Sequence, residues 1–355
     1  MKYIKLIVCW LMLLTACLPM MAAEEGGGKL NTSQIVVGHI KDSYEWHVTN
    51  IGEKPIIINL PVIVKSMTGW HVFSTSQFAE EADSKGYRHG PYNLAIATQG
   101  DHAGKIVELV SGAEVMPFDI SITKTVAVLM IDAVLLLLCI LLPARWYRRH
   151  KASDAAPGGF TGFVEMLVSY VEENIIKAGV GEGYEKYSPY LMTCFFFILT
   201  CNLMGIVPFP PGGGNVTGNI AVTFFLAFCT FVVTQFSGSK HYWKDIFWPD
   251  VPVALKAIPL LAIIEFIGIF TKPFALMIRL FANMMAGHAI ALSLTCIIFV
   301  VAAIGGVTFY GMSAISVIMS IFMMCLEVLV CFIQAMVFTM LSSIFIGLAR
   351  AKAEE

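Results

Sequence analysis

Charged residues are scarce in this sequence. Only 14% of its 355 residues are charged and 57% are hydrophobic, whereas a soluble domain carries about 25% charged residues. The shortage of charge excludes an ordinary soluble enzyme, and the high hydrophobicity excludes a disordered chain. The formal net charge of −2 leaves no basic surface for phosphates, so we expect no nucleic-acid partner. The composition indicates a membrane protein.

Cysteine is absent from residues 24–120, which excludes a disulfide-stapled module in that polar region. All nine cysteines of the chain lie in apolar stretches, without the spacing of a metal site. We interpret them as small hydrophobic side chains. The histidines of the polar region share no ligand spacing, so we expect neither a metal nor a cofactor.

The N-terminus predicts a signal peptide over residues 1–23. Two lysines precede an apolar run, and a small-residue cleavage site follows near Ala23. Residues 14–17 (LTAC) also resemble a lipoprotein cleavage box, which would make Cys17 a lipidated N-terminus. A retained first helix is a third alternative, although the apolar run is short for one.

On either cleavage, residues 24–119 form an exported, periplasmic segment. Short β-branched runs at 34–37, 55–60 and 61–64 are separated by Gly, Asp, Asn and Pro. This pattern is typical of strands joined by turns. We therefore expect a small β-rich segment outside the membrane.

Long apolar runs predict five membrane-crossing helices. The first, at 120–144, is followed at once by a basic cluster, which places its end in the cytoplasm. Residues 188–237 carry no charge and predict a transmembrane hairpin. Residues 257–348 predict two further helices, which must tilt because each exceeds the ~20 residues of a perpendicular span.

Polar segments separate these spans on the predicted cytoplasmic side. The loop 145–187 includes an amphipathic pattern at 160–178, typical of a helix lying along the membrane interface. Residues 238–256 form a second loop and 349–355 a tail. We expect an all-α polytopic protein of a bacterial inner membrane, with a periplasmic N-terminus and a cytoplasmic C-terminus.

Ionisable residues lie inside the last two predicted helices, where each costs about 2.5–3.5 kcal/mol and therefore indicates function. The earlier of these two helices carries Glu265, Arg279 and His288, and the later one carries Glu327. Arg279 has no acid within one turn of its own segment. Its partner must come from another helix or another chain.

Helical spacing groups these residues further. Arg279 and Asn283 are four apart and share a face, while Glu327 and Gln334 are seven apart and lie on one stripe. His288 is nine residues after Arg279 and points to roughly the opposite side. One helix thus offers a fixed cation and an imidazole on different faces.

The string RLFANMMAGH at 279–288, with Glu265, Glu327 and Gln334, closely resembles the a-subunit family of rotary F-type ATP synthases. The similarity extends over about residues 120–350. The long exported region resembles the variant found in Bacteroidetes-type bacteria.

The resemblance implies a non-catalytic stator subunit that conducts protons through two half-channels to and from the carboxylates of a c-ring, coupling ion flow to rotation and ATP synthesis. Arg279 matches the arginine that faces the ring, with Asn283 and Gln334 beside it. His288 and Glu327 match the pair of the outer half-channel, in exchanged order. Glu265 matches the acid of the inner half-channel. The implied partners are the c-ring, the b subunits of the peripheral stalk, the remaining ATP synthase subunits and the lipid bilayer.

Two other functions remain as alternatives. A secondary transporter would use Arg279 to bind an anionic substrate at the midplane, but it would favour internal repeats, and none is found. A membrane scaffold would have no use for four buried ionisable residues.

Overall fold

A computed structural model describes residues 42–51, 54–79, 81–110, 113–151, 155–207, 214–247, 260–302 and 306–350. The predicted signal peptide with its alternative cleavage sites, the β-branched run at 34–37 and the tail from residue 351 lie outside these ranges.

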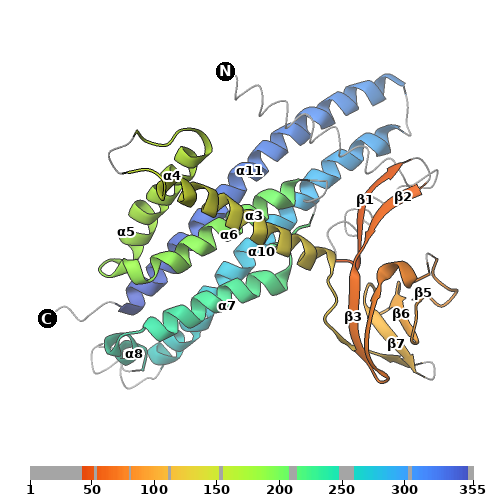
Figure 1. The fold of residues 1–355 in the computed structure, drawn as a ribbon, viewed down its shortest axis with the longest axis horizontal. Helices are drawn as coiled ribbons and strands as arrows, with labels where there is room; N and C mark the ends of the chain where they lie inside the picture. Colours follow the sequence, from red (N-terminus) through yellow and green to blue (C-terminus); the bar gives the residue numbers. More distant parts are fainter. Residues whose placement is uncertain are drawn as a thin grey trace. The chain divides into compact units, whose positions relative to one another are not determined.

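The segment before residue 120 folds into short strands, as its β-branched runs predict (Figure 1). The runs at 55–60 and 61–64 fall on β2 and β3. The elements are β1 (Glu45–Ile51), β2 (Lys54–Asn59), β3 (Pro61–Ser66), β4 (Gly69–Ser74), the 3-10 turn η1 (Thr75–Gln77), β5 (Tyr87–His89), β6 (Leu94–Ala97), β7 (Ile106–Val110), β8 (Ala113–Val115) and β9 (Phe118–Asp119).

These strands form antiparallel sheets in the orders β1-β2, β4-β3-β9 and β5-β6-β7-β8. Strand β3 alternates buried and more exposed residues, because successive side chains point to opposite faces. Its Val62 and Val64 pack with Leu94 and Ile106 of the four-stranded sheet into one core. Burial of β-branched side chains therefore holds the exported segment together.

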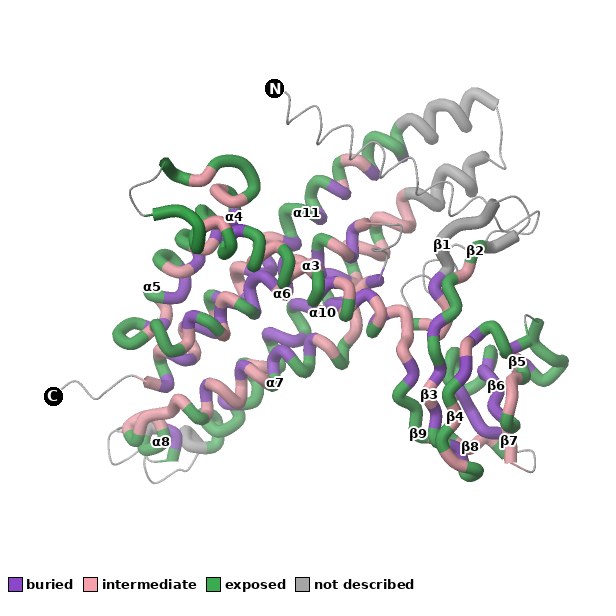
Figure 2. Tube along the Cα trace, in the orientation of Figure 1, coloured by how far each residue is buried: buried purple, intermediate pink, exposed green. Residues whose placement is uncertain are grey.

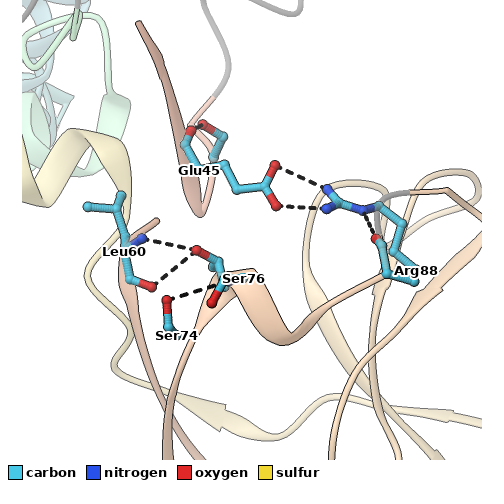
Figure 3. Close-up of polar contacts among 8 residues, drawn as sticks. Glu45, Leu60, Ser74, Ser76 and Arg88 are labelled. Atoms are coloured by element: carbon cyan, nitrogen blue, oxygen red, sulfur yellow. Dashed lines mark hydrogen bonds and ion pairs between the residues drawn. The ribbon is translucent and has the colours of Figure 1, made fainter. Parts of the chain in front are cut away.

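An ion pair links β1 to β5 within this segment. The Arg88 guanidinium donates to both carboxylate oxygens of Glu45, at 2.7 and 3.2 Å, and its Nε donates to the Ala79 carbonyl oxygen (Figure 3). The two-pronged geometry is the stronger form of an arginine–carboxylate contact.

The N-terminal β segment, residues 42–119 of the described chain, is fastened to the start of the first described helix, α3 (Lys124–Tyr147). The Asp42 carboxylate accepts a hydrogen bond from the Thr125 amide at 3.0 Å, and the Ser43 carbonyl accepts one from the Lys124 amide at 2.8 Å. An acid at this place satisfies free amides and complements the helix dipole. Burial and the Asp119 carboxylate raise the pKa of Tyr44, whose hydroxyl donates to Asp119 at 2.5 Å.

The remaining elements are helical. They are α4 (Gly159–Val171), the π-helical turn η2 (Glu172–Ile176), α5 (Lys177–Val180), the 3-10 turn η3 (Tyr184–Lys186), α6 (Ser188–Ile206), α7 (Ile220–Ser237), α8 (Lys240–Phe247), α10 (Leu260–Ala302) and α11 (Gly306–Arg350).

The helices differ from the sequence expectations mainly at their ends. Helix α3 begins four residues after the expected start at residue 120, because the Ile120 amide is still hydrogen-bonded to the Ile63 carbonyl of β3. The amphipathic pattern at 160–178 is helical but is divided by η2. The two long C-terminal helices are confirmed, with 43 residues in α10 and 45 in α11.

Four helical stretches among the described residues are long and apolar enough to cross a membrane: Lys124–Tyr147, Ser188–Ile206, Ile220–Ser237 and Ile315–Arg350. Exposed residues recur along these helices (Figure 2). They include large apolar side chains, such as Leu137 and Leu141 on α3 and Phe224 and Phe225 on α7. Such surfaces suit contact with lipid rather than water. The chain is thus mostly helical, with small sheets near its N-terminus.

A continuous apolar core joins α4, η2, α5, α6, α7, α10 and α11. At its centre are the fully buried Phe195 of α6 and Phe338 of α11, together with Leu280 of α10. This core fixes the faces that α10 and α11 turn toward one another, which positions the candidate site.

Val62→Ala should loosen the exported segment. Val62 is 0% exposed, so the lost methyl groups and the remaining cavity cost about 2 kcal/mol. Hydrogen exchange in peptides from β3 and β6 should accelerate by about 30-fold, since 1.4 kcal/mol is a factor of ten. The matched control is Val72→Ala on the paired strand β4, where the side chain is 70% exposed. Equal exchange in both variants would contradict the proposed core.

Candidate functional site

The described polar residues of the last two helices meet between α10 and α11, which run side by side (Figure 1). The Asn283 side-chain amide of α10 donates to Gln334 Oε1 of α11 at 2.8 Å. Gln334 is 5% exposed, so this bond joins the two helices within an apolar surrounding. The structure thus brings together Asn283 and Gln334, which the sequence analysis placed on separate helices.

A cavity of about 220 Å³ opens at this bond. Its polar lining consists of Asn202 from α6, Asn283 from α10, and Glu327 and Gln334 from α11. Its other lining side chains are apolar or small: Leu280, Met284, Ala286, Gly287, Met323, Leu326, Val330 and Cys331. The volume is enough for several water molecules, each of which needs polar partners of the kind present here.

Glu327 is the acidic group of this cavity. It is 8% exposed, and its buried Oε1 has no hydrogen-bond partner in the part of the chain that the structure describes. Gln334 lies seven residues later on the same stripe of α11, about 10 Å along the axis. An unpaired carboxyl in an apolar wall is costly, and it is the kind of group that exchanges protons with cavity water.

Arg279 lies one turn before Asn283 on α10 but does not line the cavity. It is exposed, and within the described residues it has neither an ion pair nor a hydrogen bond. A guanidinium stays charged in any protein environment. This charge therefore has no counter-ion within the part of the chain that the structure describes.

The two other predicted site residues lie apart from the cavity. Glu265 is exposed on α10, 14 residues before Arg279 and therefore about 21 Å along the helix. His288 is half-buried on α10 and is not among the cavity-lining residues, although its neighbour Gly287 is.

Sequence reasoning did not single out Asn202. This residue is 1% exposed on α6, and its Oδ1 accepts a hydrogen bond from the Thr217 hydroxyl at 2.6 Å. The sequence did offer one signal for Asn202: an amide side chain inside a predicted span that carries no charged residue. Only the packing of α6 against α10 and α11 assigns it to the cavity.

Within the described residues, no group of three or more His, Cys, Asp or Glu side chains is placed to hold a metal ion. The described histidines of the exported segment have other neighbours. His71, for example, stacks on Tyr92 and contacts the Ser66 and Thr68 hydroxyls.

Two family models match this chain. One, described as ATP synthase A chain, matches residues 127–347, and the other, described as Domain of unknown function (DUF8433), matches residues 35–125. The two matches meet where α3 begins. The exported segment and the helical part therefore correspond to separate families.

Curated relatives agree with the first match. ATP synthase subunit a of Chlorobium phaeobacteroides is 38% identical over 323 residues, which cover 80% of this chain and 90% of the relative. ATP synthase subunit a 2 of Chlorobaculum tepidum is 44% identical over 68% of this chain and 66% of the relative. ATP synthase subunit a of Anaeromyxobacter dehalogenans is 39% identical over 64% of this chain and 58% of the relative. The likeness to a Bacteroidetes-type variant stays a prediction.

Cys331 offers a test of whether the cavity holds water. It lines the cavity at 2% exposure, whereas Cys194 lies in the apolar core at 4%. Silver ions, which are small enough to enter a water-filled space, should protect Cys331 in native membranes from later alkylation in denaturant. They should leave Cys194 unprotected, and Cys331→Ser serves as the control for peptide assignment. If silver leaves Cys331 as unprotected as Cys194, the cavity is dry.

Proposed function

We propose a proton path that starts from one fact: this chain belongs to the ATP synthase A chain family. It is a non-catalytic, proton-conducting stator subunit of an F-type ATP synthase. The proposal concerns which of its residues carry the protons and how they are arranged in the membrane.

The observation that carries the proposal is the state of Arg279. The guanidinium is exposed on α10 and has no counter-ion among the described residues of its own chain. Its partner is therefore an acid that arrives from another subunit. In this family that acid is the membrane carboxylate of the rotating c-ring, and Arg279 faces the ring.

Electrostatics explain why an arginine suits this position. A carboxylic acid surrounded by lipid stays protonated, because burial penalises the charged form. At about 4 Å from a guanidinium, attraction is about 4 kcal/mol at an effective dielectric of 20, which nearly offsets that penalty. The ring acid thus releases its proton only beside Arg279. Because arginine keeps its own proton, it separates two half-channels without relaying protons between them.

The outer half-channel is the cavity between α10 and α11. Glu327 takes up protons there, and the hydrogen-bonded Asn283 and Gln334 hold the two helices together at its inner end. His288, close to the cavity in sequence, acts with Glu327 as a second protonatable group. Water in the cavity connects these groups to the ring acid.

The inner half-channel contains Glu265. Its position about 21 Å before Arg279 on α10 places it at a different depth from the cavity. Protons that leave the ring on this side pass Glu265 to the cytoplasm. Each charge that crosses releases about 2.3 kcal/mol per 100 mV, which supplies the torque.

Five spans complete the proposed arrangement: the four stretches that meet the length and hydropathy requirements, with α10 as the fifth. Residues 24–119 lie in the periplasm after removal of a signal peptide at 1–23, and the C-terminus lies in the cytoplasm of a bacterial inner membrane. The c-ring and the b subunits of the peripheral stalk are the proposed neighbours. Family membership leaves no reason to retain a secondary transporter as an alternative.

Arg279→Lys should abolish coupled ATP synthesis in assembled complexes. A buried lysine can lose its proton, so it no longer fixes a permanent positive charge between the half-channels. Synthesis is measured in membrane vesicles, with subunit content checked by co-purification. Lys272→Arg on the same helix is the matched control, because Lys272 lies near the Phe345 ring and outside the cavity. Normal synthesis in Arg279→Lys would refute the proposed role.

Exchanging the proposed outer pair should restore part of its function. The double variant His288→Glu with Glu327→His keeps one acid and one imidazole, so it should conduct more protons than either single variant. Passive proton flux through the membrane sector, freed of its soluble part, is the measurement. If all three variants lose flux equally, the two residues do not act as a pair.

A further inference from the structure

A buried acid on α3 has no place in the proton path described so far. Asp132 is 1% exposed, and neither of its carboxylate oxygens has a hydrogen-bond partner among the described residues. It lies eight residues into the helix, about 12 Å from the start of α3. A buried carboxyl without a partner is energetically unfavourable at this depth, and such a residue is therefore expected to have a function.

The surroundings of Asp132 belong to the bundle rather than to lipid. Leu136 and Ile140, one and two turns later on the same stripe of α3, pack on the core that includes α6. The Cys201 thiol of α6 lies beside the Asp132 carboxyl. A thiol is a weak donor and cannot compensate for a buried carboxyl.

The residue after Cys201 on α6 is Asn202, which is part of the cavity wall. Asn202 lines the space that contains Glu327, and it accepts a hydrogen bond from Thr217, which is 0% exposed. Asn215, just before Thr217, has a buried side-chain nitrogen without a partner. Asp132 thus lies beside Cys201 of α6, and the adjacent residue Asn202 bonds Thr217 and lines the cavity that contains Glu327.

We propose that Asp132 is a further proton-carrying group of the outer half-channel, located between exported-side water and Glu327. It takes up one proton from that water, releases the same proton through cavity water to the Glu327 carboxylate, and returns to its ionised form. This inference rests on the proposed function, because it needs Glu327 to deliver protons to the ring.

Few other charged groups lie near Asp132 and Glu327 to take part in this proton exchange. The titratable side chain that faces Asp132 from the packed helix α6 is Cys201. Around Glu327, the titratable neighbours include Cys331 on its own helix. On α10, an added Cβ at Gly287 would lie 3.5 Å from Glu327 Oε1, and the next residue is His288, the second protonatable group of the proposed path. Asp132 and Glu327 are thus the carboxyl groups that dominate proton exchange here.

Asp132→Asn tests the proposal in assembled ATP synthase reconstituted into vesicles. The amide has the size of the carboxyl but carries no exchangeable acid proton. Passive flux from the exported side should fall about tenfold, less than the 10²–10⁴ of a positioned acid–base group, because water replaces part of the route. Asp132→Glu should retain flux and shift its dependence on exported-side pH. A wild-type pH profile in Asp132→Asn would overturn the proposal.

If Asp132 and Glu327 act in series on one proton route, the effects of replacing them should not multiply. In a Glu327→Gln background, adding Asp132→Asn should cause no additional loss of flux, because the two groups lie on one route. Multiplied losses would overturn that arrangement. If Arg279→Lys and Glu327→Gln both leave flux unchanged, the proposed function fails. If they impair flux and Asp132→Asn does not, only the role of Asp132 fails.

Infrared spectroscopy gives a readout that does not require the Asn variant to assemble. Difference spectra between two exported-side pH values should contain a carboxyl band in the wild-type complex, and Asp132→Glu should move that band. Absence of a band that responds to this substitution would mean that Asp132 does not exchange protons, and would overturn the proposal.

Discussion

A guanidinium that stays charged inside a membrane helix is the constraint on which the rest of this structure depends. Arg279 cannot lose its proton, and the described part of its own chain provides no acid beside it. In the proposed function, the partner of this charge is an acid of another subunit. The polar contact one turn further on, between Asn283 and Gln334, keeps α11 against α10 at that depth.

Close packing makes this placement reliable. The core formed by α4 to α7 with α10 and α11 is filled by large side chains such as Phe195 and Phe338. Near the end of α11, an added Cβ at Gly347 would collide with the Gly179 carbonyl oxygen, so the backbone of α11 approaches that of α5 closely. Beside this core lies a cavity of about 220 Å³, whose four polar lining side chains allow it to hold water.

The N-terminal β segment has its own core and its own family match, and a helix cap joins it to the start of α3. Asp42 accepts a hydrogen bond from the Thr125 amide, and β9 ends just before α3. The first turn of α3 is thereby tied to the folded strands.

The sequence by itself determined the membrane class, the two long C-terminal helices and the identity of the charged residues in them. Hydrophobic length and the cost of buried charge are local properties, and they can be read along a single chain. The β-branched runs at 55–60 and 61–64 likewise predicted β2 and β3. The start of α3 was misplaced by four residues because a hydrogen bond to β3, distant in sequence, keeps Ile120 extended. Only the tertiary structure decided that Asn202 shares a cavity with Glu327, that Asn283 bonds Gln334, and that Asp132 faces the bundle without a partner. These relations depend on how helices pack across long sequence separations, and helical periodicity gives a residue's face but not the neighbour that covers it.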